Sequence, residues 1–243
     1  MNLDYEEERV VFAMNGIFFL ALAAGLQAQS HEMGLRFGTA NYRGELAPVY
    51  NFARPGIHFG AFYRLNRGSE WSFQFGASFS QIAADDQDRQ DAFALQRNHR
   101  FETNLWEFST QVEYNFLNFR NGTRNSPQNW TPYLFSGLGV FKFEPRLNSE
   151  ANYETLGLAI PLGLGVKAIL APRWNIGLEF GGRFTFNDRL DDLGLDTRAS
   201  TANLNPKFFS GNPNDNDMYF FTSVKLSYVI PDPGKDCPVQ LPR

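Results

Sequence analysis

A long, regular alternation of apolar and polar residues is the feature that most constrains the fold of this chain. Residues 104–116 place Trp, Phe, Thr, Val and Tyr at one parity and Glu, Ser, Gln and Asn at the other. Residues 174–186 repeat the pattern. Because successive side chains of a β-strand point to opposite faces, this period of two predicts strands with one apolar and one polar face.

The length of these segments favours a membrane barrel over a soluble sandwich. Strands of soluble proteins usually have about 5 to 6 residues, whereas a tilted transmembrane strand needs about 9 to 11. The chain contains 25 Phe, yet its mean hydropathy is −0.36. Strands that are apolar on one face only reconcile these two values, whereas a helical membrane protein needs runs of about 20 apolar residues.

Six further segments alternate in the same way, which gives eight predicted strands. They are residues 32–42, 56–65, 71–79, 133–143, 158–170 and 218–230. The connections after odd-numbered strands are mostly the longer ones. Outer-membrane barrels have short periplasmic turns, long extracellular loops and an even number of strands. We therefore predict an all-β, eight-stranded antiparallel transmembrane barrel of the outer-membrane type, with both termini in the periplasm.

The facing of residues 133–143 is ambiguous, because both parities are apolar. Lys142 decides our prediction, since a Lys in lipid costs up to about 4 kcal/mol at the bilayer midplane. Placing Lys142 inside puts Tyr133, Phe135, Phe141 and Phe143 on the lipid side.

The parities predict two sets of side chains. The charged or titratable residues expected in the lumen are Glu32, Arg36, His58, Arg64, Glu107, Glu113, Lys142, Lys167, Glu179, Arg183 and Lys225. The lipid-facing residues are Trp106, Phe108, Val112, Tyr114, Phe116, Ile176, Leu178, Phe180, Phe220, Val224 and Leu226. Side chains fill the interior of an eight-stranded barrel, and buried charges must pair. We expect a salt-bridged lumen without a solute pathway.

The N-terminal residues 1–28 have the pattern of a secretory signal peptide, with an apolar core and small residues before a cleavage point after Ala28. The acidic residues before that core do not fit a signal peptide, so Met14 is a candidate for the true start. An uncleaved anchor helix is the alternative. Residues 29–230 form the predicted barrel, and residues 231–243 a Pro-rich periplasmic tail. Without residues 1–28 the chain has 22 acidic and 21 basic residues, and nothing indicates a nucleic-acid partner.

The sequence offers little for catalysis or metal binding. The three histidines lack metal-site spacing, and the acidic stretches 188–196 and 211–217 lack the spacing of a calcium loop. His58 with Ser78 or Ser80 is the one candidate for an acyl hydrolase, although a lumen histidine is the simpler interpretation. Cys237 has no nearby His. We predict no catalytic residue, cofactor or metal.

Several segments together resemble the PorG-like family of outer-membrane barrels from the type IX secretion system of the Bacteroidetes. The most specific pieces are the strand that begins Thr131-Pro132-Tyr133 and ends at Pro145, the stretch RFTFNDRLDD from Arg183, and Cys237-Pro238. Weaker pieces are residues 38–46, 53–66, 160–167 and 211–221. The loop 144–157 is shorter than that family leads us to expect. The resemblance implies a non-enzymatic membrane component that meets a periplasmic ring of PorK-like and PorN-like proteins.

Three alternatives remain open at this stage. A general small barrel could act in adhesion or envelope integrity through its extracellular loops. A lipid-modifying enzyme would depend on His58. A soluble lipocalin-like barrel would place the apolar residues inside and so invert every parity given above.

Overall fold

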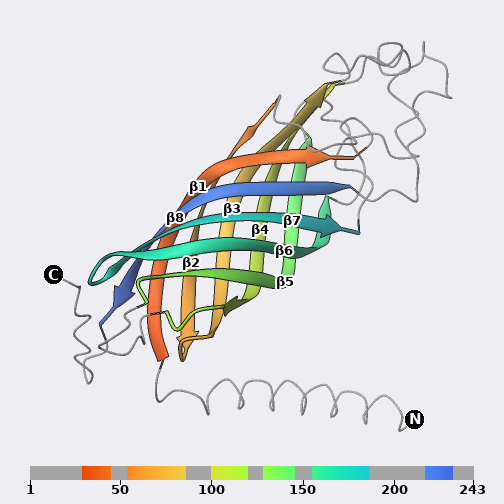
Figure 1. The fold of residues 1–243 in the computed structure, drawn as a ribbon. Helices are drawn as coiled ribbons and strands as arrows, with labels where there is room; N and C mark the ends of the chain where they lie inside the picture. The colour runs from red at the N-terminus through yellow and green to blue at the C-terminus, as the bar shows by residue number, and fades with distance from the viewer. Residues whose placement is uncertain are drawn as a thin grey trace, which may run out of the picture.

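The computed structural model describes residues 29–44, 54–85, 100–119, 128–145, 155–186 and 217–231. Eight antiparallel strands in this part of the chain form one closed barrel (Figure 1). The strands are β1 (Gln29–Arg43), β2 (Gly56–Arg67), β3 (Trp71–Asp85), β4 (Arg100–Asn115), β5 (Trp130–Pro145), β6 (Leu156–Ala171), β7 (Trp174–Thr185) and β8 (Met218–Ile230). The predicted fold class is confirmed.

Each strand pairs with the next one along the chain, and the pairing of β1 with β8 closes the barrel. This last seam runs from the pair His31 and Ile230 to the pair Arg43 and Met218. In Figure 1, β6, β7 and β8 run across β2, β3 and β4, which lie behind them. Such crossing is expected, because strands must tilt to close a barrel of this size.

The strands are 12 to 16 residues long, and each overlaps a segment that the alternation predicted, although β4 and β7 end one residue before the predicted limits of 116 and 186. The largest difference is β3, which continues to Asp85 instead of ending at Phe79. In this extension the inward residues Ile82 and Ala84 are apolar, and Gln81 on the outer side donates a hydrogen bond to Asn104 of β4 at 3.2 Å. The alternation of apolar outward and polar inward residues therefore ends near Phe79, although the strand itself continues toward the long loops.

The barrel has two unlike ends. At one end, which we call the short-turn end, β2 and β3 are joined by residues 68–70, where Gly68 has a φ of 73°, and β6 and β7 by residues 172–173. Glycine adopts this left-handed conformation without a steric penalty. The connection between β4 and β5, residues 116–129, also lies at the short-turn end. The other four connections, residues 44–55, 86–99, 146–155 and 186–217, lie at the opposite end, which we call the long-loop end. No helix in the described part of the chain is long and apolar enough to span a membrane.

Candidate functional site

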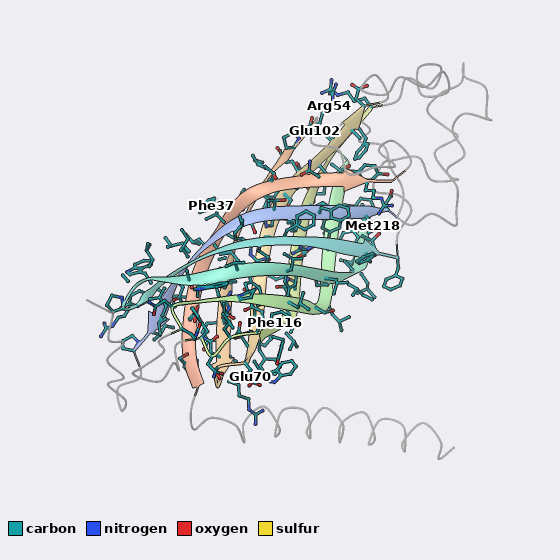
Figure 2. The ribbon with its side chains drawn as sticks, viewed as in Figure 1. Phe37, Arg54, Glu70, Glu102, Phe116 and Met218 are labelled. Carbon is teal, nitrogen blue, oxygen red and sulfur yellow. The ribbon has the colours of Figure 1, made fainter. Side chains whose placement is uncertain are left out.

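The outer wall of the barrel is apolar on all eight strands, each of which exposes large hydrophobic side chains. Figure 2 shows these side chains on one side of the barrel, with Phe37 labelled. The side chains of Phe108 and Leu138 are 69% and 71% exposed. Soluble monomers rarely present so continuous an apolar surface to water, whereas it matches the hydrocarbon of a bilayer. A lipocalin-like soluble barrel would bury these residues, so that alternative is wrong.

Outside β5, all the residues predicted to face lipid lie at outward positions. Most are exposed, and the remaining three are half-buried among their neighbours on the wall. The exposed members are Trp106, Phe108, Phe116, Ile176, Leu178, Phe180, Val224 and Leu226, and the half-buried ones are Val112, Tyr114 and Phe220.

Large aromatic side chains gather on the outer wall near the short-turn end. Trp71 packs against Tyr114 with ring centroids 4.9 Å apart, and Trp174 against Tyr228 at 5.2 Å. Trp130 is exposed at the same end, at the first position of β5. Trp and Tyr favour the boundary between hydrocarbon and water, so this arrangement indicates one membrane interface.

Hydrogen bonds tie the turn between β2 and β3 to the end of β4. The backbone N–H of Asn115 donates to the carbonyl oxygen of Glu70 at 2.6 Å, and its side-chain amide donates to the carbonyl oxygen of Ser69 at 3.0 Å. The exposed charged residues Arg67, Glu70 and Arg173 lie on this end. We call these three residues the short-turn rim; it is a fixed, charged surface beside the membrane interface.

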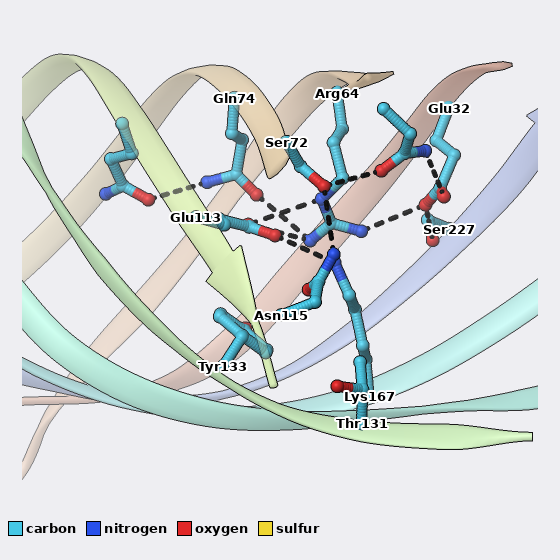
Figure 3. A network of polar contacts seen from close by, with 12 residues as sticks. Glu32, Arg64, Ser72, Gln74, Glu113, Asn115, Thr131, Tyr133, Lys167 and Ser227 are labelled. Carbon is cyan, nitrogen blue, oxygen red and sulfur yellow. Dashed lines mark hydrogen bonds and ion pairs between the residues drawn. The ribbon is translucent and has the colours of Figure 1, made fainter. Parts of the chain in front are cut away.

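The half of the lumen next to the short turns is filled by a charged network centred on Arg64 (Figure 3). The Arg64 guanidinium donates to Glu32 at 2.9 Å, to Glu113 at 3.0 Å and to Gln74 at 3.3 Å. Glu32 also accepts hydrogen bonds from Asn66 at 2.7 Å and from the Ser227 hydroxyl at 2.9 Å. These side chains come from five strands, so the network joins opposite walls of the barrel.

Two lysines complete this charged layer. Lys167 pairs with Glu113 at 3.0 Å, and Lys225 pairs with Glu179 at 2.6 Å and lies 3.6 Å from Glu113. The Tyr133 hydroxyl donates to Glu179 at 2.9 Å. Charges are tolerated in so dry a place only when they are paired and hydrogen-bonded. The layer therefore closes the lumen with polar side chains.

The half of the lumen toward the long loops is closed differently, by an apolar and largely aromatic layer. Its members are Ala40, Tyr42, Ile82, Ala84, Phe101, Leu105, Phe141, Phe143, Ala159, Tyr219 and Phe221. At its inner boundary the Tyr219 hydroxyl donates to Glu107 at 2.7 Å, and Arg183 lies 3.5 Å from the same carboxylate oxygen. The Arg183 guanidinium also covers the Phe221 ring at 4.3 Å.

The predicted facing of β5 is wrong. Lys142 lies outside, half exposed, and pairs with Glu144 at 2.7 Å, whereas Tyr133, Phe135, Phe141 and Phe143 are buried in the lumen. The cost of a Lys on the outer wall falls to about 0–1 kcal/mol near a membrane interface, and Lys142 is only three positions from the end of β5. Phe141 and Phe143 belong to the aromatic layer, and the Tyr133 hydroxyl donates to Glu179 of the charged layer, so the packing of the lumen fixes the facing of β5.

The other predicted lumen residues all lie inside the barrel and are almost fully buried. They are Glu32, Arg36, His58, Arg64, Glu107, Glu113, Lys167, Glu179, Arg183 and Lys225. The polar partners Gln74, Gln111, Tyr133 and Ser227 were not singled out from the sequence. The alternation of their strands already indicated that Gln74, Gln111 and Ser227 face the lumen. It gave no such indication for Tyr133, because the facing of β5 was predicted the wrong way round.

His58 has the geometry of a packed lumen residue. Its Nδ1 lies 2.8 Å from the Ser80 hydroxyl, and its ring stacks on Phe221 at 3.8 Å. A hydrolase would need an acid or amide on the other ring nitrogen, yet Nε2 has no hydrogen-bond partner among the described residues. His58 is 2% exposed, so no acyl substrate in the membrane reaches it.

Metal binding finds no support in the part of the chain that is described, where no three His, Cys, Asp or Glu side chains form a cluster that could hold an ion. Several sequence predictions concern residues outside the described ranges: the signal peptide, residues 188–196, most of 211–217, His99, Cys237 and nearly all of the predicted tail.

Comparisons with known proteins return one family and several barrels of bacterial envelopes. The model described as "Domain of unknown function (DUF6089)" matches residues 10–238. Neisserial surface protein A is 10% identical with a TM-score of 0.48, over 84% of this chain and all of that one. OprG from Pseudomonas aeruginosa is 9% identical with a TM-score of 0.43, over 86% and 99%.

Ail, the attachment invasion locus protein of Yersinia pestis, solved with a heparin analogue, is 8% identical with a TM-score of 0.41, over 82% of this chain and 97% of that one. No curated protein matches the chain. The strand register described above defines the fold independently of these similarities.

Proposed function

Since the chain belongs to the DUF6089 family, which spans nearly all of it, we propose that it is a non-enzymatic outer-membrane barrel that anchors or helps assemble the type IX secretion machinery. It acts through its periplasmic side, where ring components similar to PorK and PorN dock. Both termini are periplasmic, and outer-membrane lipid surrounds the wall.

The observation that carries this proposal is the closed lumen. Buried ion pairs fill one half and aromatic rings fill the other, which argues against a route for a solute through the described barrel. Its apolar wall suits lipid. A role in transport or catalysis through the lumen is therefore disfavoured, and the surfaces at the two ends remain for function.

The choice of the periplasmic end rests on two supports. Short turns of outer-membrane barrels face the periplasm, so we assign the short-turn rim to that side. The resemblance of the strand from Thr131 to Pro145 and of the stretch beginning at Arg183 to the PorG-like family supports the secretion system as the partner. The rim carries exposed charges of both signs, which can complement the charges of a partner surface.

A clean deletion tests the proposal in the native organism. We expect loss of cargo export by the type IX system, and co-purification of the tagged barrel with the periplasmic ring from gently solubilised envelopes. Normal export in the deletion strain would end the proposal.

Charge reversal at the rim locates the contact. Arg67→Glu with Arg173→Glu should reduce ring recovery at unchanged barrel abundance, because neither side chain enters the lumen network. Arg100→Glu, also exposed but at the long-loop end, is the matched control and should leave recovery intact. If only the control variant fails, the barrel acts through its extracellular side, as an adhesion or envelope-integrity role requires.

A further inference from the structure

One lumen cation, Arg36, makes no ion pair among the described residues, although the carboxylates of Glu179 and Glu107 are near enough to attract it. In the lumen network the buried carboxylates are Glu32, Glu107, Glu113 and Glu179, and the buried cations are Arg36, Arg64, Lys167, Arg183 and Lys225. Asp85 and Asp217 are also buried, but they lie at the long-loop ends of the strands, where Asp85 pairs with Arg54 and Asp217 accepts a hydrogen bond from Tyr42. Four of the cations lie within 3.5 Å of a carboxylate oxygen. Arg36, which is 1% exposed, has no ion pair in the described part of the chain. With five cations and four carboxylates, this network carries one positive charge in excess.

The unsatisfied atoms of Arg36 are Nε and Nη2. These two nitrogens form one edge of the planar guanidinium, the edge that binds a carboxylate or similar anion with two parallel hydrogen bonds. The guanidinium lies 5.5 Å from the centre of the Phe62 ring, and Nη2 comes so close to Gly76 that a Cβ on this glycine would lie 2.5 Å from it. Arg36 therefore reaches across the lumen from β1 to β3.

A second unsatisfied donor belongs to the neighbouring strand. The Oε1 of Gln111 accepts a hydrogen bond from Gln74 at 2.8 Å, but its Nε2 has no partner among the described residues. Gln111 pairs with Gln74 in the β3–β4 register, and the next inward position along β3 is Gly76, against which Arg36 lies. Counted from Gly76 toward the short turns, Gln111 is therefore the first inward side chain of β4.

Existing acceptors in this layer do not resolve the imbalance. The Glu107 carboxylate is already engaged by Tyr219 and Arg183 through Oε2, and its Oε1 has no hydrogen bond from the described residues. Leaving a guanidinium unpaired in so dry a place costs several kcal/mol. A water molecule would supply an acceptor but no charge, whereas an anion supplies both.

We propose that the barrel holds one small monovalent anion, a halide or an oxyanion of formate size, against the Nε and Nη2 edge of Arg36 with the Gln111 amide as a second donor. The anion is monovalent because the lumen network has one positive charge in excess. The ion is a structural ligand that completes the lumen network, and this inference is independent of the proposed role in secretion.

The test uses the folded, purified full-length barrel in a zwitterionic detergent, first exchanged into gluconate, an anion too bulky for the lumen. Its unfolding midpoint is measured while chloride or formate replaces gluconate at constant ionic strength. We expect a saturable rise on the order of several degrees, since a ligand that binds only the folded state stabilises it. Arg36→Met should abolish the dependence, and the surface control Lys142→Met should keep it.

Arg36→Lys provides a second variant if Arg36→Met does not fold, because it keeps the charge but loses the two-nitrogen edge. We expect its half-saturating anion concentration to rise at least about tenfold. Crystals grown in bromide should show an anomalous peak beside Arg36. A midpoint that is identical in chloride, formate and gluconate, or a site occupied by water without a bromide peak, would overturn the proposal.

Discussion

Removing the charge of Glu113 should strongly destabilise the barrel. This carboxylate lies at the centre of the charged layer: Arg64 and Lys167 both approach it at 3.0 Å and Lys225 at 3.6 Å, and its side chain is fully buried. Glu113→Gln keeps the shape but leaves three buried cations short of one negative charge. Breaking a buried ion pair from one side costs about 3–5 kcal/mol, so we expect a loss of free energy of unfolding in that range.

Glu144→Gln is the matched control, because it removes the same charge from an ion pair that is half exposed on the outer wall. Surface pairs contribute about 0–1 kcal/mol. Both variants can be unfolded by urea in lipid vesicles and followed by tryptophan emission, since Trp71, Trp106, Trp130 and Trp174 all lie on the wall. Equal free energies of unfolding for the two variants would refute the reasoning that the lumen network holds the barrel together.

Three further predictions follow from the same structure. Phe108→Arg, at a wall position 69% exposed, should lower the free energy of unfolding in vesicles by about 2–4 kcal/mol. Phe116→Arg, at the edge of the wall, should lower it by little. Equal losses at both sites would contradict a bilayer around the wall. Gly163→Ala should destabilise the barrel by about 1–3 kcal/mol, because its Cβ would lie 2.3 Å from the Phe180 carbonyl oxygen, whereas Gly139→Ala, with 3.6 Å of space, should be nearly neutral in the same urea assay. His58→Ala should leave cargo export and lipid composition unchanged at normal barrel abundance, and a specific change in envelope lipids would restore the enzyme hypothesis.

The strands could be predicted because one face of each is lipid and the other is a polar lumen. This contrast is strongest in β4 and β7. It also holds around Arg64, Glu113 and Lys225, whose charged side chains alternate with apolar ones on the outer wall. It fails in β5, where the lumen of the long-loop half is as apolar as the wall. There both faces of the strand are apolar in the sequence, so the prediction depended on Lys142 alone. Because Lys142 lies near the end of the strand, where a lysine on the outer wall costs little, that prediction was wrong.

The partners within the lumen could not be derived from alternation. Arg64 of β2 meets Glu113 of β4, and Lys225 of β8 meets Glu179 of the adjacent β7, through side chains that reach across or along the barrel. Such contacts depend on the stagger of the strands, which the hydrogen-bond register fixes. Parity gives the facing of a residue, but only the register gives the residue that it meets.

The closed lumen is the central claim, and conductance across a planar bilayer tests it most directly. The purified, folded barrel should insert without producing current steps above the leak of the bare membrane, because ion pairs fill one half of the lumen and aromatic rings fill the other. Stable ohmic steps that scale with the amount of inserted protein, and that change in Glu113→Gln, would show an open pathway and contradict the account.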